Sequence, residues 1–272
     1  MDFAPLWDFG NPAISEQRFR AALATAGGDD ALILQTQIAR TYGLRRDFDR
    51  AREILQALEP QLAAAGAEPR IRHALELGRT YASAAHPKES QTPQAKARAR
   101  ALYLQAFDLA RKEKFDGLAI DAVHMLSFVD SEPADQLRWA QEALALVAAS
   151  SQPAARKWEA SLRNNAGYAL HQLGRHEEAL AQFEQALALR ERGTDVAATR
   201  VARWMVAWTL RSLGRLDEAL RLQLALEREW DAAGAPDPYV FEELELLYRA
   251  KGDEGRAEHY AAKAAKSKSK GG

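Results

Sequence analysis

Apolar and small residues recur along the chain at intervals that fit amphipathic helices, and one such pattern occurs twice between Arg163 and Leu226. Each residue of the second copy follows its counterpart in the first by forty positions. A period between about 20 and 50 residues is typical of stacked supersecondary units, because each unit buries its apolar face only against its neighbours. The first copy carries Gly167, Leu170, Gly174, Ala179, Phe183 and Ala186, and the second carries Ala207, Leu210, Gly214, Ala219, Gln223 and Leu226.

The spacing within each copy predicts two helices joined by a tight turn. Gly167 and Ala207 lie in the middle of the first helix, where a small residue lets the second helix approach closely. Gly174 and Gly214 each follow a Leu and precede an Arg, at the point where a helix needs a left-handed terminating residue. Arg46 occupies this turn position in the first repeat of the chain, so we expect that turn to be closed differently.

These copies resemble tetratricopeptide repeats, whose pattern is a small residue followed by Tyr, Gly, Ala, an aromatic residue and Ala. The first copy matches this pattern with Leu170 in place of the Tyr. The forty-residue period exceeds the roughly 34 residues usual in the family. The ending from Ala186 to Gly193 is similar to the longer-period repeats of kinesin light chains. The resemblance implies an all-α, right-handed solenoid of helix-turn-helix repeats, and it implies no motor-linked function.

Three segments are expected along the chain. Residues 1–29 would form an N-terminal segment and a capping helix, with Asn11 and Pro12 typical of a helix start. Residues 30–262 would form a solenoid of about six repeats. Residues 263–272 are rich in Lys and Gly and are expected to form a flexible tail.

Two repeats depart from the pattern. Ala99 follows Tyr81 by eighteen positions, where the corresponding residues of the clear copies are nine apart, and the excess contains Pro and polar residues. We therefore expect an inserted loop in the second repeat. The third repeat is degenerate, with helices expected from Gly117 to Val129 and from Pro133 to Ala149.

Charge and composition narrow the function classes. The 37 basic and 38 acidic residues give a formal net charge of -1, so no global field attracts nucleic acid or an anionic membrane. The absence of Cys excludes disulfides, thiolate nucleophiles and Cys-ligated metals. The N-terminal sequence has no secretory pattern, and no stretch of 18 apolar residues follows it. A cytoplasmic location is therefore expected.

Motifs that carry chemistry are absent from the sequence. It contains no phosphate-binding loop, dinucleotide fingerprint, nucleophile elbow or paired-His zinc motif. The six His residues show no metal-ligand spacing, so we expect neither a metal nor another cofactor. An enzyme remains a minor alternative, and it would need His171, Arg211 and Asp121 to cluster.

Binding is the function that the repeat pattern favours. The resemblance implies that the first helices of successive repeats line a concave groove, and that four positions around the small residue point into it. Asn, Tyr, Trp and Arg at these positions supply hydrogen bonds and rigid apolar area for a peptide or a protein partner. Among these positions, the residues expected to bind a partner are Asp121 and Met125 in the third repeat, Asn164, Asn165, Tyr168 and His171 in the fourth, and Trp204, Trp208 and Arg211 in the fifth.

Alternatives stay open for several of these residues. A shift of one residue in register would move Trp204 or Trp208 from the groove into the core. A structural role through self-association, giving a homo-oligomer, is the second function considered. Phe3, Trp7 and Phe9 are too apolar for a free tail, so they should dock either on their own solenoid or in a neighbour's groove. If they fill their own groove, they would compete with a partner.

Overall fold

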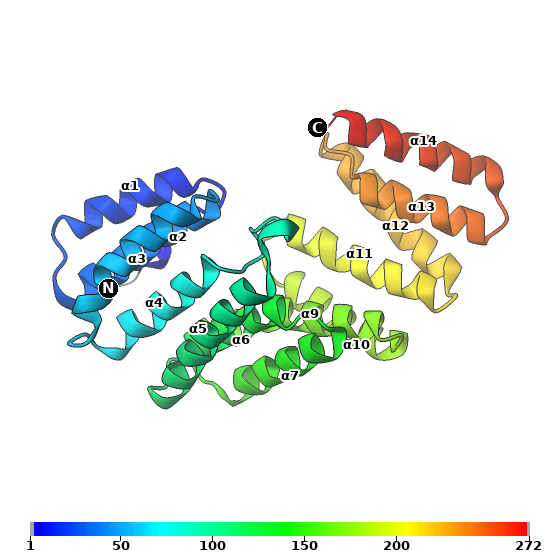
Figure 1. Ribbon diagram of the computed structural model, residues 1–272. Coiled ribbons are helices and arrows are strands. Elements are labelled where there is room, and N and C mark those ends of the chain that lie inside the picture. The colour runs from blue at the N-terminus through cyan, green and yellow to red at the C-terminus, as the bar shows by residue number, and fades with distance from the viewer. Residues whose placement is uncertain (1–2, 271–272) are drawn as a thin grey trace. The chain divides into compact units, whose positions relative to one another are not determined.

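The computed structural model describes residues 3–270, and every regular element within that range is a helix (Figure 1). The chain falls into two compact units, Met1–Trp158 (unit 1) and Glu159–Gly272 (unit 2). Unit 1 contains η1 (Ala4–Leu6), α1 (Pro12–Leu23), α2 (Gly28–Leu44), α3 (Phe48–Leu62), α4 (Ala67–Arg79), η2 (Lys88–Ser90), α5 (Pro93–Lys112), α6 (Asp116–Val129), α7 (Pro133–Ala149) and α8 (Pro153–Arg156). Unit 2 contains α9 (Glu159–Gln172), α10 (His176–Arg190), α11 (Val196–Ser212), α12 (Leu216–Ala232), α13 (Pro238–Ala250) and α14 (Glu254–Lys270).

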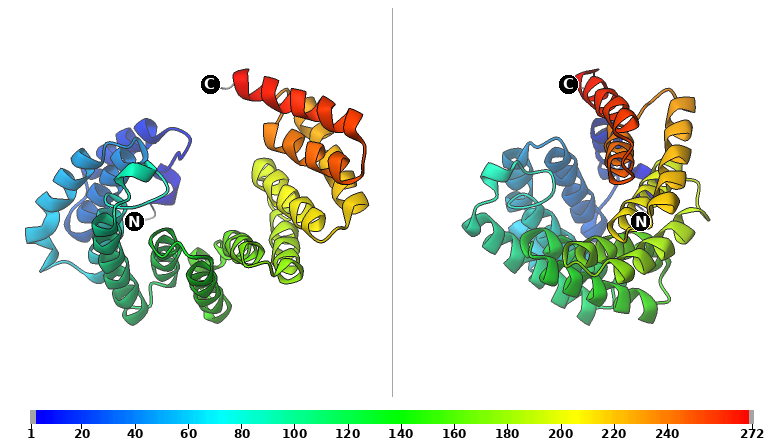
Figure 2. Two further views of the ribbon diagram at one scale, coloured as in Figure 1. Left: turned by 45° about the vertical axis from the view of Figure 1, so that its right-hand side comes forward. Right: turned by 90° about the vertical axis from the view of Figure 1, so that its right-hand side faces the viewer.

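Consecutive helices pack as pairs, as the sequence predicts. The pairs are α2 with α3, α4 with α5 and α6 with α7 in unit 1, and α9 with α10, α11 with α12 and α13 with α14 in unit 2. Both views of Figure 2 show α13 and α14 lying along each other. The third repeat, which has the weakest pattern, starts one residue earlier than expected and ends as expected.

Small residues set the helix crossings in both units. A methyl group on Gly167 would lie 2.7 Å from the ring of Phe183, which is fully buried in the paired helix. Gly78 has the same relation to the buried ring of Tyr103, at 2.5 Å. Such distances are too short for any side chain, so glycine permits the close packing that fills each core.

The turns of unit 2 follow the glycine prediction. Gly174 has φ 74° and Gly214 has φ 73°, in the left-handed region. The amide of Arg175 donates to the carbonyl of Leu170 at 2.9 Å, which satisfies a carbonyl at the end of α9.

The expectation of a different turn at Arg46 is wrong. Arg46 itself adopts the left-handed conformation, with φ 64°, although it carries a side chain. The amide of Asp47 donates to the carbonyl of Tyr42 at 3.0 Å, the same bond that closes the glycine turns. The repeat geometry therefore imposes this turn even without glycine, and Arg46 carries the steric cost.

The N-terminal aromatic segment packs against its own unit. Phe3 is 7% exposed and belongs to a core cluster with Phe19 and residues of α2. The ring nitrogen of Trp7 donates to Gln37 Oε1 at 3.3 Å, and the ring of Trp7 meets that of Phe19 edge to face. The segment is therefore docked on α1 and α2 of its own chain.

The inserted loop agrees with the prediction, whereas the C-terminal segment is more helical than predicted. The insertion between α4 and α5 is a loop that contains the short helix η2, which confirms the prediction. α14 continues to Lys270, so most of the segment predicted as a tail lies in a helix, and Gly271 and Gly272 fall outside the described residues.

Candidate functional site

Most of the residues predicted to bind a partner lie on two helices of unit 2. Asn164, Asn165, Tyr168 and His171 belong to α9, and Trp204, Trp208 and Arg211 belong to α11. Residues three and four apart on a helix share one face, so the members of each set can line up along their helix.

Aromatic rings from both helices meet in one row. The ring of Trp208 lies 3.4 Å from that of His171 and 6.0 Å from that of Tyr168, measured between centroids, with planes inclined by 20° and 26°. Trp204 lies 5.8 Å from Trp208 at 20°. We refer to Tyr168, His171, Trp204 and Trp208 as the aromatic row.

The aromatic row is partly open to solvent. The side chain of Tyr168 is 43% exposed, and Trp204 and Trp208 are half-buried. The ring nitrogen of Trp204 donates to the carbonyl of Tyr239 in α13 at 3.3 Å. The two tryptophans therefore pack between helices on one side and keep accessible area on the other. Each is partly a core residue and partly an exposed one, the two alternatives considered from the sequence.

His171 is held as a neutral ring. Its Nε2 atom lies 2.9 Å from the hydroxyl of Ser212. Burial is the largest cause, followed by the neighbouring His176 and Arg211, and together they lower the pKa of His171 to about 4. An uncharged imidazole can stack closely on Trp208, and it suits a packing and hydrogen-bonding role better than acid-base chemistry near neutral pH.

Arg211 has an internal partner. Its Nε and Nη2 atoms donate to the two carboxylate oxygens of Glu243 in α13, at 2.7 and 2.9 Å. Glu243 is 4% exposed, so this bidentate pair links the first helices of two successive repeats. The sequence predicts that Arg211 pairs with a ligand carboxylate. In this structure the guanidinium of Arg211 pairs with Glu243 of the same chain instead.

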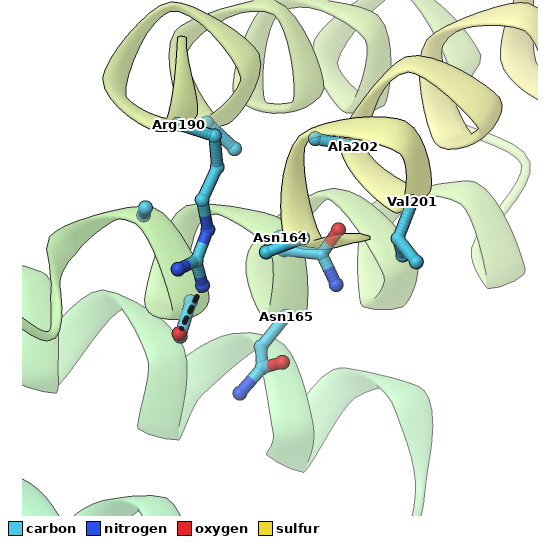
Figure 3. Close-up of a pocket in the computed structure, with 9 residues that line it drawn as sticks. Asn164, Asn165, Arg190, Val201 and Ala202 are labelled. Carbon is cyan, nitrogen blue, oxygen red and sulfur yellow. Dashed lines mark hydrogen bonds between the residues drawn. The ribbon is translucent and has the colours of Figure 1, made fainter. Parts of the chain in front are cut away.

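Asn164 and Asn165 line a pocket of about 330 Å³ at the start of α11 (Figure 3). Val201 and Ala202 of α11 form the apolar wall, and Arg190 enters from the end of α10. Arg190 is a site residue that the sequence reasoning missed. It lies in the ending of the first clear repeat, which was used only to identify the repeat type.

The two predicted residues of unit 1 are buried. Met125 lies in α6 and is 5% exposed. Asp121 is 8% exposed and pairs with Arg79 of α4. Burial alone would raise the pKa of Asp121, but the charges of Arg79 and Arg40 outweigh it and hold that pKa below its ordinary value.

Asp121 also borders a second cavity, which lies within unit 1. This cavity measures about 770 Å³, and the docked N-terminal segment forms one wall through Phe3, Trp7 and Phe9. Trp158 and Lys157 lie on its lining as well. The N-terminal segment therefore covers part of the surface that α2, α4 and α6 form in unit 1.

Metal sites and membrane-spanning helices are two further features to consider. Within residues 3–270 no group of three or more His, Asp or Glu side chains is placed to hold a metal ion. In the same range, no helix combines the length and the apolar character that a membrane span requires.

Comparison with known proteins identifies the repeat type. The tetratricopeptide repeat family model matches residues 158–225. No curated protein sequence matches the chain.

Solved structures share the fold at low identity. A Signal Transduction ATPase with Numerous Domains from Pyrococcus horikoshii, with a tetratricopeptide repeat sensor, matches at TM-score 0.70 and 13% identity over 93% of this chain and 38% of that one. The chain thus spans less than half the length of that protein. Kinesin light chain repeats from Podosopora anserina match at TM-score 0.56 and 16% identity, over 74% and 94% of the two chains. A Rap protein complexed with Competence and Sporulation Factor matches at TM-score 0.53 and 13% identity, over 94% and 79%.

These findings agree with the helix pairs and the turn geometry described above. The fold class predicted from the sequence, a right-handed α-solenoid of helix-turn-helix repeats, is confirmed. Residues 158–225 are therefore tetratricopeptide repeats, and the described chain has the all-α fold of tetratricopeptide-like repeat proteins, including those of the kinesin light chain type.

Proposed function

We propose that this chain is a non-catalytic scaffold that binds a peptide or a protein partner on the exposed face of α9 and α11. The observation that carries the proposal is the partly exposed aromatic row beside the pocket of Asn164 and Asn165. Aromatic side chains contribute large contact area at low entropic cost, and they are enriched among the residues that dominate binding energy.

An extended segment suits the chemistry of this face. Asn side chains both donate and accept hydrogen bonds, so Asn164 and Asn165 can pair with a ligand's main chain. Tyr168, Trp204 and Trp208 would anchor apolar side chains of the same segment. The Rap protein solved with Competence and Sporulation Factor has the same fold class, which supports a binding role for this chain at the level of the fold.

An enzymatic role receives less support from the contacts. His171 is hydrogen-bonded to Ser212 and stacked on Trp208, Arg211 is paired with Glu243, and Asp121 is paired with Arg79. Each of the three titratable candidates is thus engaged in a contact that stabilises its own unit.

Affinity capture tests the proposal. The bait would be the wild-type chain and a double variant, Asn165→Ala with Trp208→Ala. The matched control is Gln185→Ala with Arg221→Ala, two exposed residues of the second helices α10 and α12. We expect the control to retain a partner that the double variant loses by at least about tenfold, because truncating a binding anchor costs on the order of 2 kcal/mol. Circular dichroism would verify that all three chains are folded.

Two results would contradict the proposal. Equal capture by folded wild type and double variant would move the binding surface away from α9 and α11. Capture of a second copy of the chain alone, supported by a concentration-dependent mass in sedimentation, would favour the self-associating structural role instead.

A further inference from the structure

The cavity of about 770 Å³ is lined by residues of unit 1 only, and it has the size of a small-molecule site. Its walls come from α2, α4, α6 and α8 and from the segment before α1. α4 contacts both α2 and α6, and α6 contacts α8, so these elements follow one another across the cavity. Ligand sites in proteins commonly enclose about 300 to 1,000 Å³, so this one can hold an organic molecule with several rings.

Aromatic side chains line the cavity at both ends of this series of elements. Phe3, Trp7 and Phe9 belong to the N-terminal segment, Phe115 directly precedes α6, and Trp158 follows α8. The rings of Trp7 and Phe9 stack at 4.7 Å with planes inclined by 3°, yet Phe9 is 62% exposed. An exposed ring beside a cavity offers a face or an edge to a second ring. The aromatic residues therefore favour a ligand with a flat ring system.

The wall that α6 and α8 form is held by close backbone packing. A methyl group on Gly117 would lie 2.9 Å from the Cβ atom of Ala154 and 3.2 Å from its carbonyl group, and both residues line the cavity. The side-chain amide of Gln152 donates to the carbonyl of Lys114 at 2.7 Å, which ties the start of α8 to the residues before α6. A wall that is already in place lowers the ordering cost of binding a ligand.

The charges on the lining leave one cation in excess. Four of the five charged lining residues belong to ion pairs within unit 1, namely Arg72 with Glu68, Arg40 with Glu76, and Asp121 with Arg79. The fifth is Lys157, and no carboxylate among residues 3–270 forms an ion pair with it. The lining therefore has a net positive charge, and Lys157 is the group that can pair with an anion from outside the chain.

We propose that the cavity of unit 1 binds a small planar aromatic molecule that carries one negative charge. Its ring system would lie between the N-terminal aromatic residues and Trp158, and its anionic group would pair with Lys157. The flexible stem of a lysine lets the ammonium follow such a group. Ligands with several negative charges are disfavoured, because Glu68 and Asp121 also line the cavity. The site goes beyond the proposed function, since it lies in unit 1 and takes a small molecule rather than a partner segment.

A pair of matched probes tests the site directly. Naphthalene-2-sulfonate is a fused-ring anion, and naphthalene-2-sulfonamide has nearly the same shape without the charge. Each would be titrated into the full chain, with the tryptophan indoles labelled with ¹⁵N and observed by NMR. We expect the signals of Trp7 and Trp158 to shift at lower probe concentrations than those of the two tryptophans in the aromatic row. The dissociation constant of the sulfonate should be below about 1 mM and that of the sulfonamide about threefold higher.

Variants assign the two parts of the recognition. Lys157→Gln should make the two probes bind equally, whereas Lys112→Gln, which changes an exposed lysine outside the lining, should preserve the difference. Phe9→Ala should weaken both probes by about fivefold, because it removes one aromatic contact. Tyr239→Ala is the matched control, since Tyr239 is also 62% exposed but lies in unit 2, and it should leave both affinities unchanged.

The outcomes are independent of the binding face proposed for unit 2. Equal affinity of the two probes for the wild-type chain, or an undiminished difference in Lys157→Gln, would overturn the role of the positive charge. Signals that shift first in the aromatic row would overturn the site in unit 1. Capture of a partner by the α9 and α11 face can succeed or fail without changing either result, because that experiment alters only Asn165 and Trp208.

Discussion

One position of the repeat, the residue that follows the small crossing residue, has a different chemistry in the first repeats of the two units. In the first two repeats of unit 1 this position holds Arg40 and Arg79, and in the first two repeats of unit 2 it holds Tyr168 and Trp208. The register of the repeat is the same in both units, so the difference lies in the chemistry of one side chain per helix.

In unit 1 the two arginines form a charged layer beneath the N-terminal segment. Arg40 and Arg79 both pair with Glu76, and Arg79 also pairs with Asp121. The guanidinium of Arg40 lies 5.6 Å from the centroid of the Trp7 ring, a cation–π contact that fixes the segment over the layer. Aromatic area in this unit is therefore supplied by the chain's own N-terminus.

In unit 2 the same position supplies the aromatic area directly. Tyr168 is 43% exposed, and Trp208 joins it in the aromatic row. The contrast shows that a groove position of the repeat pattern identifies where a side chain points, while its neighbours decide whether it stabilises the unit or stays accessible. This contrast supports unit 2 as the location of the proposed binding role.

The largest effect should come from breaking the charged layer of unit 1. Asp121→Ala removes one partner of a buried ion pair and leaves Arg79 undercompensated, which should lower the stability of α4 and α6 by about 3 kcal/mol. Hydrogen exchange read by mass spectrometry would measure this loss separately in the two units. Asp217→Ala is the control, because the side chain of Asp217 is 79% exposed and a solvent-exposed pair such as the one with Lys251 contributes little to stability. Similar losses in both variants would mean that the charged layer is not a stabilising feature.

A smaller effect is expected from removing aromatic residues of the two units. Trp7→Ala should destabilise α1 and α2 by about 2 kcal/mol, because Trp7 contacts Phe19, Gln37 and Arg40. Tyr168→Ala should destabilise α9 by less than about 1 kcal/mol, because much of its ring already faces solvent. The same hydrogen-exchange measurement distinguishes the two. Equal losses would remove the distinction between a structural and an accessible set of aromatic residues.

Local features of the sequence predicted the helix pairs well, because they depend on residues close together in the chain. The pattern around Gly167 and Phe183 identifies a helix, a turn and a returning helix within a single repeat. The pairing of Arg211 with Glu243, by contrast, joins residues 32 positions apart. Its formation depends on how one repeat packs on the next, which the residue types alone do not determine.

The same limitation explains two other differences. Asp121 was assigned to the groove, and its burial depends on Arg79, which lies 42 positions earlier. The repeat pattern does not indicate Arg190, because this residue ends a second helix and the predicted groove positions lie on first helices. The pocket of Arg190 arises where the end of α10 meets the start of α11, a junction that the repeat pattern does not describe.

Protonation of His171 should affect unit 2 by about 1 kcal/mol. Its pKa is lowered to about 4 in the folded state, against the usual 6.5, so the unfolded chain binds more protons between these values. The stability of α9 and α11 should therefore fall as the pH drops from 6.5 to 4. The full shift corresponds to several kcal/mol, and solvent screening of the partly exposed ring reduces it to the smaller figure.

The pH effect has a direct control. His171→Phe retains a ring that can stack on Trp208 but cannot be protonated, so the fall in stability of unit 2 should become shallower. Titration of the imidazole signals by NMR would give the pKa itself. A pKa near 6.5 for His171 would contradict the lowered pKa and the pH dependence expected from it.

The smallest effect concerns the turn that both units share. Arg46 has φ 64° and Gly174 has φ 74°, so the same backbone conformation is held with and without a side chain. A side chain in this conformation costs about 1 kcal/mol, and Arg46→Gly removes that cost. Because glycine also gives the unfolded chain more freedom, the variant should be more stable by only about 0.5 kcal/mol. Gly174→Ala should be less stable by about 1 kcal/mol. Arg46→Ala keeps the Cβ atom and should therefore gain no stability. Hydrogen exchange in α2 and α3 would measure both variants. Equal slowing of exchange in the Gly and Ala variants would assign the effect to the Arg46 side chain rather than to the backbone.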